Sequence, residues 1–300
     1  MGPISQNKLN LLIVLGTLVL ILGCMCNPDR NDSGDFNLSS DSNSESTPRS
    51  DDSDSGDDSS GSSDRKEDRG DFVVEDTDVE NPNFEGIHRE IKQARVLEKA
   101  ADKLNRTLIL PHDIKLRTKD CGTVNAFYDP RDKSITFCYE LMAHLYNLFR
   151  SDGASEREAN EQMGKAVNFI FLHELGHALI DSYELPITAN EEDAADRCSS
   201  FICIEEMGDE GVGWVVAAAE AFYIQSKNRQ IGKEGLADEH LLDEQRFFTS
   251  LCMIYGSDPN KYAHFVSRGL LPDARARRCP TEYAKTAKAW EQLLEPWRKD

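Results

Sequence analysis

The chain has 300 residues, of which 39% are hydrophobic, and its 54 acidic and 34 basic residues give a formal net charge of −20. This acidity excludes nucleic acid as a partner and excludes docking on anionic lipid through a basic face, because both need clustered Lys and Arg. The charge is uneven: residues 24–80 carry 18 acidic and five basic residues, a net −13, whereas residues 81–300 carry 36 and 28. The sequence therefore predicts three parts in series.

Residues 1–23 are the first part, with an uncharged apolar run that follows Lys8. The run has the length of a signal peptide and falls short of the roughly 20 residues of a membrane-spanning helix. It ends in Ile21-Leu-Gly-Cys24, which resembles the bacterial lipobox, whose cysteine is lipidated after cleavage. An uncleaved signal anchor is the alternative. Both predict a membrane-anchored, extracytoplasmic protein of the cell envelope, and the first predicts a lipoprotein.

Residues 24–82 are rich in Asp, Ser, Gly and Asn and contain few apolar side chains. Such a segment buries too little apolar surface to offset its conformational entropy, so we expect a disordered acidic tether. Repulsion between its carboxylates would extend it. The folded domain is then expected over residues 83–300.

In that domain an amphipathic pattern predicts a helix over residues 85–105. Four short runs typical of strands follow. The turn at residues 129–133 joins the last two, residues 124–128 and 134–138, into a predicted hairpin. After Tyr139 the chain reads as helical almost to its end. We therefore expect an α+β fold, with a small, mostly antiparallel N-terminal sheet that has an edge hairpin, followed by a helical domain. The expected strands are residues 107–110, 114–117, 124–128 and 134–138.

The eight cysteines include no Cys-x-x-Cys pair, which argues against a structural zinc ribbon. An exported domain can form disulfides. Cys121 and Cys138 flank the expected hairpin, and Cys252 and Cys279 flank the segment between two late helices. These two pairs are the candidates for disulfides, and buried thiols are the alternative, because sequence alone does not fix the connectivity.

A His-Glu-x-x-His motif lies in a largely apolar helical stretch, with His173, Glu174 and His177 as its fixed residues. At 3.6 residues per turn, the two histidines project from one face of the helix, one turn apart, which suits two ligands of a single metal ion. Glu174 then reaches a water molecule in the open coordination position. The motif predicts a zinc centre in which Glu174 is the general base.

A third ligand is expected from Glu-x-x-x-Asp on the next helix, supplied by Glu192 and Asp196. Glu192 completes a His2Glu site, and Asp196 accepts the second N–H of His173, which orients that imidazole. The alternative is that the acidic residues at 191–193 only complement the helix dipole. The metzincin pattern is excluded, because Ile180 and Tyr183 stand where it needs Gly and His.

These motifs resemble the gluzincin peptidases, of which thermolysin is the best known. Taken together, the motifs make the chain similar to the bacterial metallopeptidase family named domain of unknown function 4344. The similarity runs from about Ile87 to Trp297. This resemblance implies a zincin-like helical domain and zinc peptidase activity, and it leaves the substrate open. The segments that carry it are Cys121–Pro130, Cys138–Leu141, Phe171–Ile180, Glu191–Asp196, Asp238–Arg246 and Tyr255–Pro259.

Thermolysin-like enzymes also carry an Asn-Ala-Phe segment on an edge strand that binds the substrate backbone. Asn125 and Ala126 stand at the corresponding place, where an extended peptide can add as a further strand. An ordinary hairpin is the alternative. A donor for the developing oxyanion is expected from His240, or else from Tyr223.

Together these residues predict a membrane-anchored, zinc-dependent peptidase that acts on peptides or proteins. Glu174 would take a proton from the metal-bound water and pass it to the leaving amine. One alternative is an inactive binding protein with the same fold. Another is a zinc hydrolase of a non-peptide amide.

Overall fold

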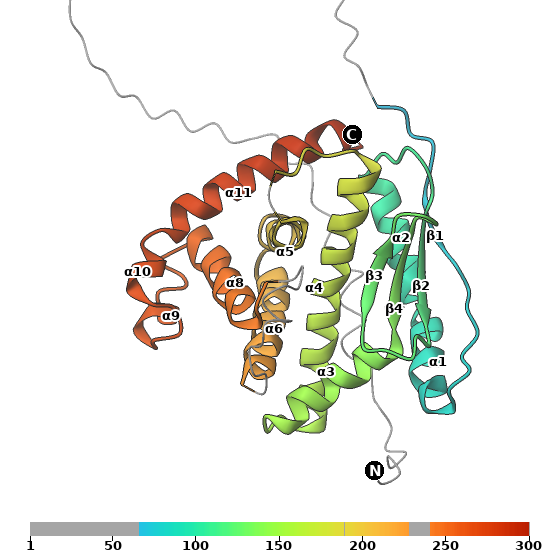
Figure 1. Cartoon of the computed structure of the whole chain (residues 1–300), viewed down its shortest axis with the longest axis horizontal. Coiled ribbons are helices and arrows are strands. Elements are labelled where there is room, and N and C mark those ends of the chain that lie inside the picture. The colour runs from blue at the N-terminus through green and yellow to red at the C-terminus, as the bar shows by residue number, and fades with distance from the viewer. Residues whose placement is uncertain (1–65, 189, 228–240, 300) are drawn as a thin grey trace, which may run out of the picture. The chain divides into compact units, whose positions relative to one another are not determined.

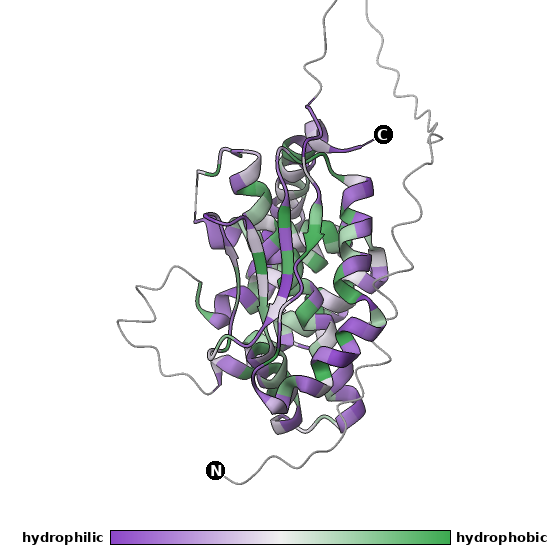
Figure 2. Ribbon diagram, turned by 90° about the vertical axis from the view of Figure 1, so that its right-hand side faces the viewer, coloured by the Kyte–Doolittle hydropathy of each residue, from purple (hydrophilic) through white to green (hydrophobic). Residues whose placement is uncertain are grey.

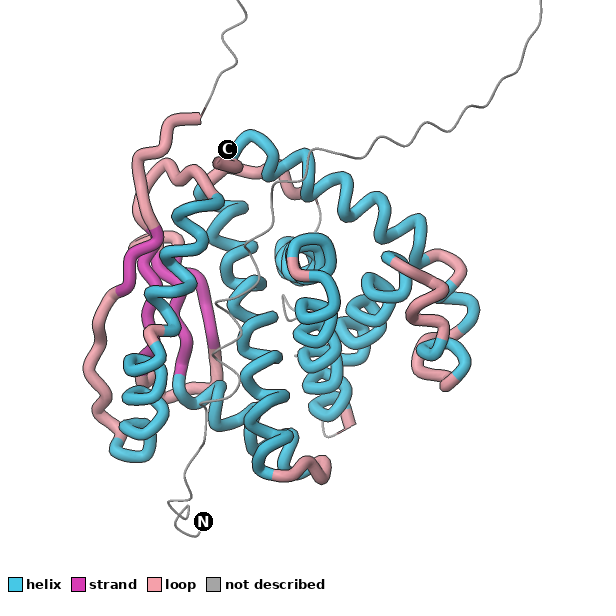
Figure 3. Tube along the Cα trace, turned by 180° about the vertical axis from the view of Figure 1, so that it is seen from behind, coloured by secondary structure: helices cyan, strands magenta, loops and turns pink. Residues whose placement is uncertain are grey.

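The computed structural model describes residues 66–188, 190–227 and 241–299. A small sheet lies beside a larger group of helices, and the long helix α4 (Glu156–Ser182) runs between them (Figure 1; Figure 3). The apolar run, Cys24, the tether up to residue 65 and His240 lie outside the described residues. Among the helices that are described, none has the length and apolar character required to span a bilayer.

The sheet contains β1 (Phe72–Val74), β2 (Ile114–Lys119), β3 (Ala126–Asp129) and β4 (Ser134–Cys138), in the order β1-β2-β4-β3. The expected hairpin is present, with β3 and β4 antiparallel and β3 at the edge. The expectation of a mostly antiparallel sheet is wrong, because β2 is parallel to both β1 and β4. Helices α1 (Glu85–Ala94) and α2 (Val96–Thr107) return the chain to the starting end of the sheet before β2, and such a crossover joins parallel strands.

Two boundaries also differ from expectation. The helix expected over residues 85–105 is divided into α1 (Glu85–Ala94) and α2 (Val96–Thr107), because Arg95 between them has the left-handed φ of 52°. Thr107–Leu110, expected as a strand, contributes only isolated bridges. Phe72–Val74 lies within the stretch expected to be tether, yet it pairs with β2, so the folded part begins before residue 83.

The helical part follows the hairpin directly. In it α4 packs against α3, α5 and α6 on one side and against β3 and β4 on the other. The remaining short elements are a π-helical turn and two 3-10 turns, together with two helices of four residues each. The elements are α3 (Tyr139–Ser151), α5 (Glu191–Phe201), the π turn (Ile202–Glu206), α6 (Gly208–Ser226), α8 (Asp243–Ser257), α9 (His264–Ser267), α10 (Asp273–Ala276), α11 (Cys279–Leu294), and the 3-10 turns Pro82–Phe84 and Glu295–Trp297.

Local sequence explains where α4 begins and how closely α5 approaches it. Ser155 and Glu158 form a capping box that satisfies the first backbone N–H groups of the helix. Further along, a Cβ at Gly176 would lie 3.2 Å from the Cα of Ala195 in α5. The missing side chain at Gly176 therefore lets α5 pack directly on α4.

Two disulfides fasten loops of the domain. Cys121 is bonded to Cys138, with Cα atoms 5.4 Å apart, and Cys252 is bonded to Cys279, with Cα atoms 5.1 Å apart. The first ties the loop that leads into β3 to the end of β4. The second ties α8 to the start of α11. Cys198 and Cys203 are buried free thiols, and burial raises the pKa of both.

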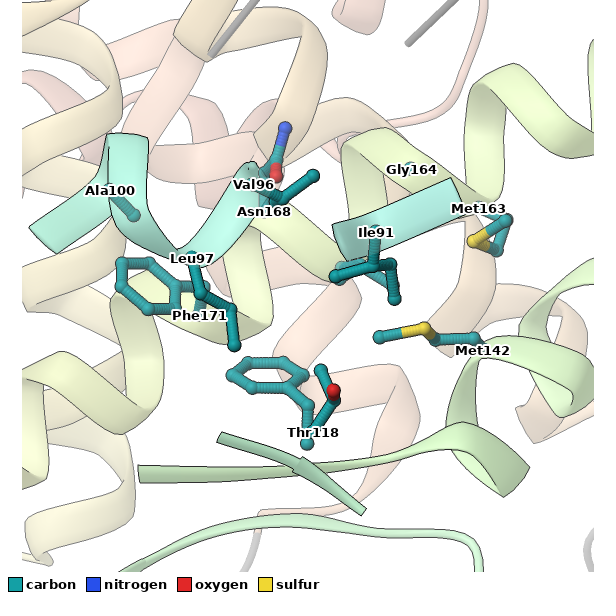
Figure 4. A pocket seen from close by; sticks show the side chains of 12 residues that line it. Ile91, Val96, Leu97, Ala100, Thr118, Met142, Met163, Gly164, Asn168 and Phe171 are labelled. Atoms are coloured by element: carbon teal, nitrogen blue, oxygen red, sulfur yellow. The ribbon is translucent and has the colours of Figure 1, made fainter. Parts of the chain in front are cut away.

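The core lies between the sheet and the helices. Along β2, Ile114, Leu116 and Thr118 are buried, while the residues between them are more exposed. Figure 2 shows that hydrophobic and hydrophilic residues also alternate within other strands and helices. A small apolar cavity of about 50 Å³ remains between α1, α2, the sheet and α4, with Met142 and Met163 in its lining (Figure 4).

Candidate metal centre

Three side chains from α4 and α5 converge. His173 and His177 lie one turn apart on α4, and their Nε2 atoms are 3.2 Å from each other. The carboxylate of Glu192, in the first turn of α5, places Oε2 at 3.2 Å from His173 Nε2 and Oε1 at 3.4 Å from His177 Nε2. This arrangement depends on Asn190, whose side chain caps α5 and fixes where its first turn begins.

The donor set fits a metal ion of the zinc type. Two imidazoles and one carboxylate are common zinc ligands, and atoms held about 2.0–2.2 Å from one ion at tetrahedral angles lie about 3.4 Å apart. The three side chains form a triangle in which the Nε2 atoms are 3.2 Å apart, Glu192 Oε2 lies 3.2 Å from His173 Nε2, and the other oxygen, Oε1, lies 3.4 Å from His177 Nε2. Each Nδ1 faces a carboxylate, which leaves both Nε2 atoms directed toward the carboxylate of Glu192. A cation bound there would replace the protons that these imidazoles otherwise hold beside that carboxylate.

His173 is held by a buried ion pair behind it. Its Nδ1–H donates to Oδ1 of Asp196 at 2.9 Å, and Asp196 in turn accepts two hydrogen bonds from Arg246 of α8, at 2.7 and 2.8 Å. The Arg246 guanidinium lies over the ring of Phe222, with its Cζ 4.0 Å from the ring centroid. Asp196 is 8% exposed. Burial alone would raise the pKa of Asp196, but Arg246 and His173 outweigh it and hold the pKa well below its usual range.

His177 has a more exposed partner. Its Nδ1–H donates to Oε1 of Glu191 at 2.8 Å, and the side chain of Glu191 is 53% exposed to solvent. The two metal-facing histidines therefore have the same kind of support, a carboxylate at Nδ1. Only the carboxylate behind His173 is buried and paired with an arginine.

The carboxylates dominate the electrostatics of the centre. Burial alone would lower the pKa of His173, but Asp196 and Glu192 outweigh it and raise the pKa to about 9. Burial opposes ionisation of Glu192 as well, yet the two histidines hold its pKa far below the usual value. The described residues around the triangle thus favour positive charge at its centre, which a divalent cation supplies.

Glu174 stands beside the triangle and reaches across to the sheet. Its Oε2 accepts a hydrogen bond from the backbone N–H of Tyr128 in β3 at 2.9 Å. The residue is 6% exposed, and burial raises the pKa of its carboxyl. Two turns further along α4, Asp181 is tied to the same hairpin, because Tyr128 Oη–H and Lys133 Nζ both donate to its Oδ2 at 2.6 Å.

A cleft of about 660 Å³ opens over the centre. Its walls are β3 on one side and the first turn of α5 on the other, with His173, Glu174 and His177 between them. Asn125 and Ala126 lie in the wall formed by β3. The backbone C=O of Asn125 accepts from the N–H of Cys138, so the strand alternation turns the backbone groups of Ala126 outward, into the cleft.

The structure thus brings together most of the residues singled out from the sequence, namely His173, Glu174, His177, Glu192, Asp196, Asn125 and Ala126. Tyr223 does not join them, because it does not line the cleft; it is 45% exposed, and its ring packs against Phe247, 5.1 Å between centroids. The sequence motifs predicted no role at the metal centre for Arg246, and for Glu191 they offered only the helix dipole. An arginine in a helix that buries Leu251 and Ile254 is a signal that could have found Arg246, since buried arginines need a counter-ion.

Comparison with known proteins agrees with this centre. The sequence profile of the family named domain of unknown function 4344, which carries the description "Putative metallopeptidase", matches residues 77–294. The match spans the sheet from β2 onward and all the helices that hold the centre. No curated protein sequence and no solved structure matches the chain significantly.

Proposed function

The chain belongs to this family of metallopeptidases, and we propose that it is a zinc peptidase of the gluzincin type that hydrolyses peptide bonds. The observation that carries the proposal is the triangle of His173, His177 and Glu192 with the carboxylate of Glu174 beside it, at the base of an open cleft. A purely structural metal site has no use for a second carboxylate in that position.

Each residue of the centre has a distinct task. His173, His177 and Glu192 would hold the zinc ion, which supplies Lewis acidity toward the scissile carbonyl and the attacking water. Glu174 takes a proton from that water and delivers it to the leaving amine. Its hydrogen bond from the Tyr128 N–H keeps the carboxylate between the metal ligands and the substrate wall.

The substrate backbone would lie along β3. Because β3 is the edge strand and Ala126 turns its N–H and C=O into the cleft, an extended peptide can add there as another strand. Asn125 lines the cleft at the start of the same wall, and its side-chain amide would contact the peptide there. This pairing aligns a peptide bond across the face of Glu174.

We also propose the location and the domain boundaries from the sequence. Residues 1–23 would direct export, and Cys24 would carry the lipid that anchors the protein in the cell envelope. The acidic stretch from residue 24 would hold the peptidase away from the membrane. Labelling of cells with a radioactive fatty acid tests this: Cys24→Ser should abolish labelling, and labelling that persists would contradict the assignment.

The activity is tested by metal content and by cleavage of a random peptide library. We expect one zinc per chain and cleavage that falls at least 1,000-fold, on the order expected for loss of a general base, in Glu174→Gln. Glu161→Gln is the matched control, because Glu161 is on the same helix but pairs with Lys165, 2.6 Å away, outside the cleft.

The outcomes separate the candidate functions. Full zinc content without any Glu174-dependent cleavage of peptides would contradict the peptidase and favour a binding protein or a hydrolase of another amide. Absence of bound metal at neutral pH would contradict every metal-dependent function.

A further inference from the structure

The hairpin of β3 and β4 is fastened to α4 near its turn. Tyr128 Oη–H and Lys133 Nζ donate to Asp181, and the Tyr128 N–H donates to Glu174. Tyr128 directly precedes Asp129, the last residue of β3 before the turn. The contact with the proposed general base therefore belongs to the turn end of the hairpin.

The opposite end of the hairpin is fastened by a disulfide. Cys121, in the loop that leads into β3, is bonded to Cys138, the last residue of β4. The N–H of Cys138 also donates to the backbone C=O of Asn125 at 3.2 Å, and Ala126 pairs with Phe137. The two residues proposed to meet the substrate backbone, Asn125 and Ala126, thus lie at the disulfide end.

The loop at this end depends on few attachments. The backbone N–H groups of Cys121 and Gly122 donate to the two carboxylate oxygens of Glu140, at 3.2 and 2.7 Å. Glu140 is at the start of α3, which follows β4 directly (Figure 1). Residues 122–125 are exposed, and in the described sheet β3 pairs only with β4. A strand end of this kind opens locally at a low free-energy cost unless a covalent bond fixes it.

The disulfide is accessible from the side of the loop. Cys138 is fully buried, but Cys121 is partly exposed and borders the exposed residues 122–125. A thiolate of a dithiol reductant attacks Cys121 Sγ, and Cys138 leaves as a thiolate that is protonated. The second thiol of the reductant then displaces Cys121, which is protonated in turn. The dithiol has given up two electrons and two protons and becomes a cyclic disulfide.

We infer that the Cys121–Cys138 disulfide is a positioning device for the substrate wall: it holds Asn125 and Ala126 where an extended peptide pairs with them, so that peptide affinity follows the oxidation state of this bond. The inference rests on the proposed function, since it takes β3 to bind the substrate. The metal ligands are on α4 and α5, and Glu174 contacts the other end of the hairpin. Loss of the bond therefore weakens substrate binding and leaves the metal and the general base in place.

The first test removes the bond by substitution. In Cys121→Ser/Cys138→Ser we expect KM for an internally quenched peptide to rise at least about tenfold, because the peptide must then order the strand that it joins. The value of kcat should stay within about threefold of the original, since the interactions made in the transition state persist. Zinc content should remain one per chain. Cys252→Ser/Cys279→Ser is the matched control, because this disulfide joins α8 to α11 and does not line the cleft.

The second test breaks the bond in the unaltered protein. The protein is reduced with a dithiol, separated from it under argon and supplied again with zinc before the assay. We expect KM to rise to the value of Cys121→Ser/Cys138→Ser and to return after reoxidation. That double variant, treated in the same way, should not change, which excludes effects of the treatment on the other disulfide or on the metal.

A milder variant covers the case in which the double variant folds poorly in thermal unfolding. Glu140→Gln leaves the disulfide intact and weakens the hydrogen bonds that hold Cys121 and Gly122. It should raise KM in the same direction by a smaller factor. Glu161→Gln, which removes a charge from α4 outside the cleft, should leave KM unchanged.

The outcomes separate this inference from the activity. An unchanged KM in the folded double variant would overturn the inference, and so would an equal rise in Cys252→Ser/Cys279→Ser or a loss of zinc and kcat together. If no peptide is cleaved in a Glu174-dependent way, the proposed function fails. If cleavage depends on Glu174 but KM ignores the state of the bond, only the role of the disulfide fails. Fluorescence anisotropy with Glu174→Gln gives the same comparison as a Kd, without turnover.

Discussion

Arg246 donates hydrogen bonds of 2.7 and 2.8 Å to the two carboxylate oxygens of Asp196, although its helix begins about fifty residues later in the chain. Asp196 uses one of these oxygens to orient His173 as well. The metal-facing nitrogen of His173 is therefore positioned through a buried chain of three residues, which joins α8, α5 and α4.

Arg246→Lys keeps the charge but loses the two-pronged geometry toward Asp196. We expect zinc affinity to fall by about 10- to 100-fold, the usual effect of removing support behind a metal ligand. Competition with a chromogenic chelator measures it directly. The exposed Arg277→Lys serves as control and should leave the affinity unchanged. Equal affinities in the two variants would show that Arg246 only packs.

The two carboxylates behind the histidines should differ in effect. Asp196→Asn removes a buried charge that faces both His173 and Arg246, so we expect zinc affinity to fall by about 10- to 100-fold. Glu191→Gln removes a partner whose side chain is 53% exposed. Solvent already weakens the interaction of this side chain with His177. Its effect should stay below about tenfold. The reverse order in a zinc titration would contradict this ranking.

Removal of the metal should destabilise the domain. Without a cation, the carboxylates and histidines at the triangle lose their common partner, and a ligand present at 1,000 times its Kd contributes about 4 kcal/mol to the folded state. For a domain of this size that corresponds to a fall in Tm of about 10 °C. Thermal unfolding with and without a chelator measures the shift, and added zinc should restore the original Tm. An unchanged Tm in a protein shown to bind zinc would refute the expectation.

Gly176 should be needed for the spacing between α4 and α5. Gly176→Ala gains helix propensity of about 1 kcal/mol, but its Cβ meets Ala195 Cα at 3.2 Å, so stability should change little. Gly176→Val adds two methyl groups against α5 and should lower both stability and zinc affinity, because Glu192 is carried on that helix. Denaturant unfolding and zinc titration of the two variants test this. A Val variant with normal zinc affinity would show that α5 adapts without moving Glu192.

The local chemistry of the centre was readable from the sequence. The four-residue spacing of His173 and His177 fixes their common face wherever the helix forms, and Asn190 before an acidic run marks the start of the next helix. The hairpin was equally local, because strand-like runs flank a turn at residues 129–133. These features depend on residues a few positions apart, and such spacing is what periodicity and capping rules describe.

The tertiary structure decided what depends on distant contacts. Strand direction was not encoded in the runs themselves, because a strand buries the same residues whether its neighbour is parallel or antiparallel, and the return of the chain through α1 and α2 made β1 and β2 parallel. Phe72–Val74 became a strand only because β2 offered a partner. Likewise Arg246 acquired a role only when α8 packed against α5. The sequence by itself determined the candidate ligands, because their spacing is local, and the packing of distant helices determined their support.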